Sequence, residues 1–344
     1  MKIYQPSYYH QFQCLAGACP DSCCQEWDVQ VDEEAAARYL ALSGSLGEDL
    51  RQKLKQENGE YVLEITNRRC PMWRADGLCR IQAELGEDAL CNVCREYPRL
   101  QHDYGDFLEL GLELSCPEAA RLILTGPDFR WAIQIAPDIE GDDYDEEAML
   151  TLIRSRREFL QFLDTTSIPF PHILTILLLY THAVQEEIDG GIPAILEPER
   201  YLSDAAKFTA SGNIRTLQDY FMGLEILTPQ WKNRLNAPAV LPQWDNRHKM
   251  LLGYFLCRYW LQAVADYDIL CRAKFAIAAC LLIGYLGGDL IETAQLFSKE
   301  IENDPDNVEA ILDGAYTTPA LTDLHLLGIL RDETSLPKVM QKIP

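Results

Sequence analysis

The segment CLAGACPDSCC, from Cys14 to Cys24, opens a stretch that holds nine of the twelve cysteines in the chain. The later cysteines of this stretch lie in three short motifs, C-P-x7-C, C-x2-C-R-x-Y-P-R and S-C-P. Thiolates at such short and irregular spacings are typical ligands of iron–sulfur clusters or zinc. We therefore predict that the first third of the chain folds around metal. The candidate ligands are Cys14, Cys19, Cys23, Cys24, Cys70, Cys79, Cys91, Cys94 and Cys116.

The same cysteines could instead form a disulfide scaffold, and the start of the chain bears on this alternative. The residues MKIYQPSYYHQFQC contain one lysine and lack the apolar run of a secretory signal peptide. We therefore expect a cytoplasmic protein. Thiols stay reduced in that compartment, so dense cysteines favour metal over disulfides.

The composition excludes some classes of partner. The 344 residues carry a formal net charge of -23, whereas nucleic acids and anionic membranes bind basic surfaces. An acidic surface would attract a basic ligand or a lysine-bearing protein, although the acidity could also serve solubility alone. The longest apolar runs, Ile173 to Tyr180 and Phe275 to Leu286, are shorter than the ~20 residues of a membrane span. We expect neither a nucleic-acid partner nor a membrane.

Hydrophobic periodicity predicts a mainly helical α+β protein. The sequence PDIEGDDYDEE carries seven acidic residues and no basic one, which is typical of a solvated linker. We therefore predict a cysteine-rich metal-binding domain with short strands over residues 1–136, an acidic linker over 137–147 and an all-helical domain over 148–344. In that last domain, apolar residues recur at spacings of three and four.

Within the cysteine-rich domain the pattern predicts strands at 27–31, 61–65 and 107–114 and helices at 33–42, 46–56 and 81–90. Asp32 is the expected N-cap of the first helix. Cys70 and Cys79 are expected on the two arms of a hairpin-like turn. Ser115 or Cys116 should cap a helix whose first turn contains Pro117, and the helix dipole would stabilise a thiolate at Cys116.

Two arginines follow the C-x2-C motif directly. Arg95 and Arg99 could bind a carboxylate of a ligand, because a guanidinium pairs with a carboxylate through two hydrogen bonds. Alternatively, they donate hydrogen bonds to cluster sulfides or to nearby acidic side chains. Loops typical of nucleotide sites (G-x-G-x-x-G, G-x4-G-K-[ST]) and the nucleophile elbow G-x-S-x-G are missing from the sequence. The residues alone therefore indicate a metal-binding module and a helical domain, without a reaction.

The order of these motifs resembles the flagellin lysine-N-methylase family. The resemblance rests on YYHQFQC, C-x3-CC-x2-W, CP-x7-C, C-x2-C-R-x-YPR and LSCPEAARLIL, and more weakly on HKMLLGYFLCRYWLQ. It implies an enzyme that methylates lysine ε-amines of flagellin with S-adenosylmethionine as donor and contains a 4Fe–4S cluster. Nine cysteines exceed the four ligands of one cluster, so bystanders or a second centre are expected. A simpler zinc- or iron-chelating family shares part of this pattern.

An enzyme of this kind must align the donor with the amine and help the amine lose a proton. Tyr97, Glu96 and Glu109 lie near the cysteine motifs and are the candidate catalytic residues, with Glu113 as a further acid. The alternative function is a non-catalytic zinc- or iron-binding module that acts in redox sensing or in protein interaction.

Overall fold

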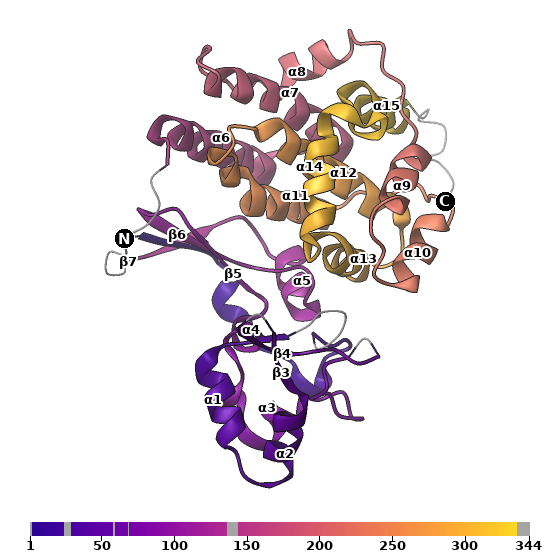
Figure 1. The fold of residues 1–344 in the computed structure, drawn as a ribbon. Helices are drawn as coiled ribbons and strands as arrows, with labels where there is room; N and C mark the ends of the chain where they lie inside the picture. Colours follow the sequence, from indigo (N-terminus) through magenta and orange to yellow (C-terminus); the bar gives the residue numbers. More distant parts are fainter. Residues whose placement is uncertain (1, 24–28, 58, 68, 136–143, 336–344) are drawn as a thin grey trace.

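The structure is a computed structural model that describes residues 2–23, 29–57, 59–67, 69–135 and 144–335. Cys24 therefore lies outside the described residues. The chain forms a mainly helical α+β protein with two small sheets in its N-terminal region and helices in its C-terminal region, so this part of the prediction is confirmed. Figure 1 shows a small lobe below, a sheet in the middle and the helical region above.

The small lobe comprises residues 29–96, without 58 and 68. Its sheet has the order β2-β4-β3, with β2 (Val29–Val31), β3 (Leu54–Glu57) and β4 (Glu60–Leu63). Its helices are α1 (Glu33–Ala41), α2 (Gly44–Lys53), α3 (Arg80–Leu85) and α4 (Asn92–Glu96). Asp32 caps α1 as predicted, because its carboxylate accepts a hydrogen bond from the Ala35 amide at 2.9 Å.

Two predicted helices of the small lobe are shorter than expected. The helix predicted to Gln56 ends at Lys53, because the residues that follow pair with β4 as a strand. The helix predicted over 81–90 ends at Leu85, because Gly86 adopts a φ of 88° that a helix cannot continue. A short 3₁₀ turn, Glu87–Ala89, then leads to Cys91.

The second sheet has the order β5-β6-β1-β7. Its strands are β1 (Lys2–Pro6), β5 (Arg99–Asp103), β6 (Phe107–Leu112) and β7 (Trp131–Ile135). The predicted strand at 107–114 is thus confirmed as β6, which pairs in parallel with β1. Strands β1, β5 and β7 were not predicted. The N-terminal strand β1 lies in the middle of this sheet, between β6 and β7.

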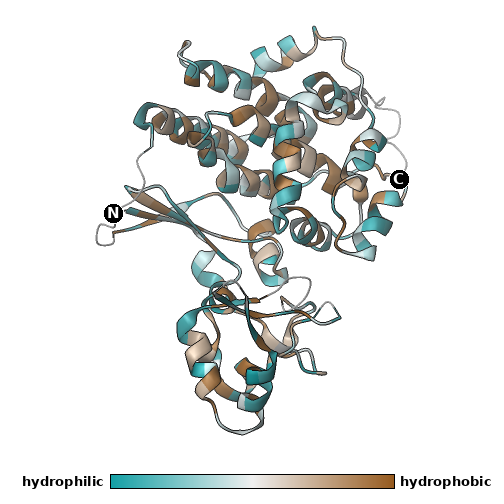
Figure 2. Cartoon of the chain, in the orientation of Figure 1, coloured by the Kyte–Doolittle hydropathy of each residue, from teal (hydrophilic) through white to brown (hydrophobic). Residues whose placement is uncertain are grey.

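The helical region begins at α5 and is built around α12 (Ile269–Leu286), every residue of which is buried. Figure 2 shows hydrophobic residues gathered on the inner sides of these helices. Within the described residues, α12 alone has the length and apolar composition to cross a membrane, and it is buried like a core helix. The other helices are α5 (Pro117–Leu124), α6 (Glu146–Thr165), α7 (Phe170–Ile188), α8 (Pro198–Ala205), α9 (Ile214–Met222), α10 (Pro229–Asn236), α11 (Asn246–Tyr259), α13 (Leu290–Phe297), α14 (Pro305–Thr317) and α15 (Asp323–Ser335).

The protein has two hydrophobic cores. The large core joins residues of the second sheet and of α5 to the helices that follow the acidic segment, so it contains Phe107 and Cys116 together with α12. The small core lies within the small lobe and contains Cys70 and Cys91. The large core therefore contains residues from both sides of segment 137–147. The domain boundaries drawn from the sequence remain a prediction.

Candidate functional site

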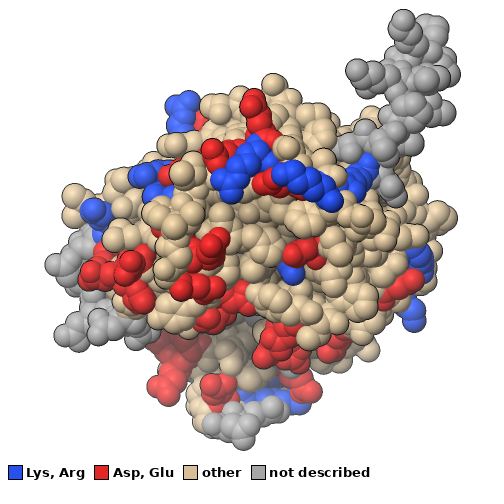
Figure 3. All heavy atoms as spheres, turned by 90° about the horizontal axis from the view of Figure 1, so that it is seen from above, with Lys and Arg blue, Asp and Glu red and all other residues tan. Residues whose placement is uncertain are grey.

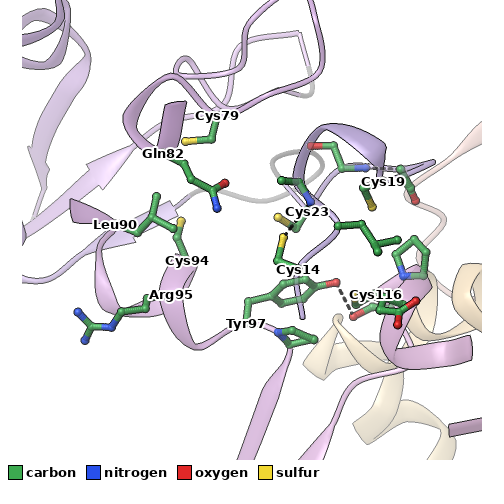
Figure 4. Close-up of a pocket in the computed structure, with 18 of the residues that line it drawn as sticks. Cys14, Cys19, Cys23, Cys79, Gln82, Leu90, Cys94, Arg95, Tyr97 and Cys116 are labelled. Carbon is green, nitrogen blue, oxygen red and sulfur yellow. Dashed lines mark hydrogen bonds between the residues drawn. The ribbon is translucent and has the colours of Figure 1, made fainter. Parts of the chain in front are cut away.

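A cavity of about 460 Å³ lies where the two cores meet. Its walls come from the loop after β1, from the small lobe, from the start of α5 and from the helical region. Figure 4 shows six cysteines around it, which are Cys14, Cys19, Cys23, Cys79, Cys94 and Cys116. Six of the nine predicted ligands are thus brought to one place, although 102 positions separate the first from the last.

The loop that carries the first three cysteines turns tightly. A 3₁₀ turn, Ala16–Ala18, closes through a hydrogen bond from the Cys19 amide to the Ala16 carbonyl at 3.0 Å. The small side chains of this turn let the backbone fold back on itself. Cys14 and Cys23 are exposed and Cys19 is half-buried, and burial raises the pKa of the Cys19 thiol.

The small lobe supplies a second group of cysteines. Cys79 precedes α3, and Cys91 and Cys94 lie at the start of α4 and one turn later. An antiparallel bridge between Trp73 and Cys79 forms the predicted hairpin-like turn. The Cys94 thiol donates a hydrogen bond to Cys91, and this bond holds the pKa of Cys91 below its ordinary value.

Cys116 caps α5 and Pro117 occupies the first helical turn, as predicted. The predicted stabilisation of the Cys116 thiolate is not found, because the structure favours the neutral thiol. Cys116 is buried in the large core, and this burial raises the pKa of its thiol to about 11 in spite of hydrogen bonds from the helix N-terminus. A thiolate at this position therefore needs a further positive charge, such as a metal ion, to replace the lost hydration.

The thiols do not converge on a single point. Among the residues that the structure describes, no group of three or more His, Cys, Asp or Glu side chains is placed to hold one metal ion. The charge of Cys23 nevertheless affects Cys19 and Cys116 on one side and Cys70 and Cys94 on the other, so Cys23 lies between the two groups. Cys70 and Cys91 belong to the small core behind the cavity wall.

The two arginines of the C-R-x-Y-P-R motif differ in their surroundings. Arg95 lines the cavity but its guanidinium points away from it, toward Asn92 at 2.6 Å and Glu96 at 3.4 Å. Arg99 lies over the Phe12 ring at 5.2 Å. Among the described residues, Arg99 has no carboxylate partner. Of the two predicted ligand-binding cations, Arg99 is therefore the one available to an anionic group in the cavity.

The three predicted catalytic residues are not brought together. Tyr97 lines the cavity, whereas neither Glu96 nor Glu109 is among its lining residues. Glu96 is exposed and pairs with Arg95. Glu109 is buried between β6 and α6, where its carboxylate makes two hydrogen bonds with Arg156, one of them 2.9 Å long. Its position indicates a structural role.

A chain of polar contacts connects Tyr97 to the helical region. The Ser115 hydroxyl donates to Glu113 at 3.0 Å, so the Tyr97 hydroxyl, 3.1 Å from the Ser115 oxygen, is the donor to Ser115. Arg258 of α11 lies 3.8 Å from Glu113 and 3.3 Å from Glu302. Burial raises the pKa of Tyr97 well above its ordinary value, so its phenol stays neutral.

Several cavity residues could not be foreseen from the motifs. Lys299 and Asp21 form an ion pair at the wall, and Glu118 pairs with Arg121 beside it. Asp21 and Glu118 lie next to cysteines in the sequence, which is a weak signal. Lys299 lies 183 positions after Cys116, and nothing in the sequence near it indicates a site.

Comparison with known proteins found relatives for part of the chain. At 34% identity over 133 residues, or 37% of this chain, it is similar to the Flagellar biosynthetic protein FliU of Salmonella muenchen and to the Lysine-N-methylases of Salmonella typhimurium and Salmonella choleraesuis. The chain covers 79% of the FliU protein but 33% of each Lysine-N-methylase. No family model matches the chain. No solved structure matches it either.

Proposed function

The chain belongs to the family of the flagellar protein FliU and the lysine-N-methylases, and from this premise we propose that it is a protein-lysine N-methyltransferase. Its proposed substrate is the ε-amine of a lysine in flagellin or in another lysine-bearing protein, and its proposed methyl donor is S-adenosylmethionine. The observation that carries the proposal is the cavity, in which thiols and a neutral tyrosine meet a guanidinium that has no carboxylate partner among the described residues. Its volume of about 460 Å³ lies within the range of small-molecule sites, roughly 300–1,000 Å³.

We propose that the same cavity holds an iron–sulfur cluster. The donor set fits, because soft thiolates are the ligands such clusters take, and the lining cysteines are Cys14, Cys19, Cys23, Cys79, Cys94 and Cys116. Zinc also takes thiolate ligands, so the proposal of a cluster rather than zinc rests on the resemblance of the cysteine motifs to the lysine-N-methylases. Bound there, the cluster would brace the cavity or offer an open iron to the amino and carboxylate groups of the donor.

The side chains of the cavity suggest how donor and amine are held. Arg99 would bind the donor carboxylate, because its guanidinium has no carboxylate partner among the described residues and lies against the Phe12 ring. Tyr97 donates its hydroxyl proton to Ser115, so its oxygen is left to accept a hydrogen bond from the substrate amine. Alignment of these two groups is what an in-line displacement requires. The amine forms a bond to the methyl carbon while the carbon–sulfur bond breaks, and one proton leaves the nitrogen.

The surface charge suits a basic partner. Figure 3 shows acidic side chains over much of the face seen from above, whereas basic ones gather in fewer places. A lysine-bearing segment would be attracted to such a surface, and a nucleic acid or an anionic membrane would be repelled. We further propose that the protein works in the cytoplasm, where its thiols would stay reduced for metal binding.

The test is a methyl-transfer assay with anaerobically purified protein. Absorption spectroscopy and elemental analysis first distinguish an iron–sulfur cluster from zinc. The protein is then incubated with S-adenosylmethionine and flagellin, and mass spectrometry is expected to detect methyl groups on lysine. The proposed enzyme would be refuted if flagellin stays unmodified and if calorimetric titration shows that the protein binds metal but not S-adenosylmethionine.

That last outcome would support the second candidate, a non-catalytic metal-binding module. One observation favours it, namely that the chain covers only 33% of each Lysine-N-methylase, so residues on which their activity depends could lie outside the shared part. Calorimetry separates the two candidates, because the module would bind metal but no S-adenosylmethionine.

A further inference from the structure

One face of a C-terminal helix contacts the cysteine loop directly. Helix α13 continues into a π-helical turn, Ser298–Glu302, a rare form of helix that is often found at functional sites. Gln295 and Lys299 are four residues apart, so they lie on one face, and Glu302 ends the π-helical turn. Figure 1 shows α13 beside α5, above the small lobe.

Two of these three side chains contact the N-terminal part of the chain, and the third contacts α11. The Gln295 amide donates to the Asp21 carboxylate at 2.7 Å and to the Ser115 carbonyl at 3.1 Å. Lys299 forms an ion pair with the same Asp21 carboxylate. Glu302 binds Arg258, which faces Glu113 at the end of the Tyr97 chain.

The contact partners of Gln295 and Lys299 lie close to cysteines in the sequence. Asp21 lies between Cys19 and Cys23, and Ser115 directly precedes Cys116. One helix face therefore holds two segments that carry three of the six cavity cysteines, from more than 170 positions away in the sequence. The ion pair is also well sheltered, with 18% of the Lys299 side chain and 29% of the Asp21 side chain exposed. It should accordingly contribute more than a surface pair.

We propose that Gln295 and Lys299 are positioning residues for the thiol site, which hold the Cys19–Cys23 segment against Cys116 and so determine how firmly the cavity retains its metal. This inference rests on the proposed metal centre. It makes the helical region part of the site rather than a separate module. Cys14 and Cys23 are exposed, so the loop has little burial of its own to keep it in place.

The test uses the full chain, purified without oxygen, and two rates that do not depend on methyl transfer. One is the release of iron to a chelator, followed by the loss of cluster absorbance. The other is alkylation of each cysteine by iodoacetamide, mapped by peptide mass spectrometry. The variants are Lys299→Ala, Gln295→Ala and Asp21→Asn, with Lys299→Arg as the conservative change. Lys232→Ala is the matched control, because Lys232 is an exposed lysine of α10 in the same half of the chain.

Loss of these contacts should speed iron release and the alkylation of the half-buried Cys19 and the buried Cys116 about tenfold, the effect expected of a charge-assisted hydrogen bond. Cys70 and Cys91 of the small core should keep their alkylation rates. Lys299→Arg should restore most of the retention and Lys232→Ala should match the unaltered protein. Lys299→Ala and Asp21→Asn should not be additive, because they break the same pair.

Unchanged alkylation of Cys19 and Cys116 in Lys299→Ala and Gln295→Ala would overturn the inference. If the purified chain holds no metal, the proposed metal centre is refuted. The alkylation rates still test whether Gln295 and Lys299 position the cysteines. Failure of the proposal and failure of the proposed function are thus distinguishable. Circular dichroism of each variant verifies that the helices remain folded.

Discussion

At the scale of single residues, the two arginines of the C-R-x-Y-P-R motif show how identical side chains differ by their surroundings. The Arg95 guanidinium is shared between Asn92 and Glu96 outside the cavity. Arg99 lies over Phe12 at the cavity wall, and the described residues offer it no carboxylate. An anion in the cavity would thus be stabilised by the charge of Arg99 and only weakly by the charge of Arg95.

We predict that Arg99→Gln raises the KM for S-adenosylmethionine about tenfold to a hundredfold, the loss expected for one charged hydrogen-bonding group. The change in kcat should be smaller, since the carboxylate lies far from the methyl group that is transferred. Steady-state kinetics measures both values. Arg95→Gln is the matched control and should leave KM within about twofold. Equal effects of the two substitutions would contradict the assignment.

Glu109 illustrates the opposite case, in which a residue near the motifs is removed from the site by packing. Its carboxylate and Arg156 form a buried ion pair that joins β6 to α6, with 6% and 8% of their side chains exposed. Removal of one partner leaves the other charge buried without compensation. Glu109→Gln should therefore lower the free energy of unfolding by about 3 kcal/mol, as measured by chemical denaturation.

Two further variants make this prediction specific. Replacing both partners with apolar residues, Glu109→Leu with Arg156→Met, should recover much of the lost stability. Glu197→Gln, in the exposed pair with Arg200, should cost less than about 1 kcal/mol. If Glu109 were catalytic, its substitution would abolish methyl transfer without such a loss of stability.

At the scale of elements, one carboxylate organises two helices of the small lobe. Asp32 accepts the Ala35 amide of α1 at 2.9 Å and the Asn92 amide of α4 at 2.7 Å. Helix α4 carries the C-x2-C pair, so this cap also fixes the place of Cys91 and Cys94. Asp32→Ala should lower the free energy of unfolding by about 2 kcal/mol, the upper end for a helix cap.

A single cap in the helical region provides the comparison. Asn213 caps α9 through the Arg215 amide at 2.7 Å, and Asn213→Ala should cost about 1 kcal/mol. Hydrogen exchange should show that Asp32→Ala loosens the amides of both α1 and α4. Loss of protection in α1 alone would mean that the bond to Asn92 contributes little.

The elements that could be predicted are those whose signals are local. Asp32 and the Cys116-Pro117 pair each mark the start of a helix, and the signal comes from residues within one helical turn. Both helices start where they were expected. Strands β1 and β7 were missed because they form by pairing across more than 100 positions, with Lys2 opposite Phe107 and Ile135. Periodicity in a window of a few residues contains no information on such pairing.

At the scale of the whole molecule, the candidate site could be predicted only in part for the same reason. The cysteine motifs indicated a set of thiols that gather, and six of them line one cavity. The walls of that cavity depend on how two cores meet, which the motifs do not encode. Lys299 lines it and Gln295 contacts its wall through the packing of α13 against α5, so these contacts became visible only from the fold.

The small lobe is short for a stable domain. Its core lies within residues 29–94 and consists of a modest set of side chains. A single core of fewer than about 70–80 residues rarely supplies more than ~3–5 kcal/mol, and natural proteins of this size often add a metal. A metal centre at the cavity would bond Cys79 and Cys94 of the small lobe to cysteines outside it, and would thereby hold the two cores together.

Removal of the metal should therefore loosen the small lobe first. After chelation under reducing conditions, hydrogen exchange should rise across α1 and α4, because the lobe loses its bonds to the rest of the chain. Helices α7 and α12 should keep their protection, since they lie in the large core and contribute no residue to the cavity lining. The control is the same treatment followed by reconstitution with iron and sulfide, which should restore the protection. Equal protection of both lobes before and after chelation would show that the cores hold together without metal, and the cysteines would then serve the chemistry of the cavity alone.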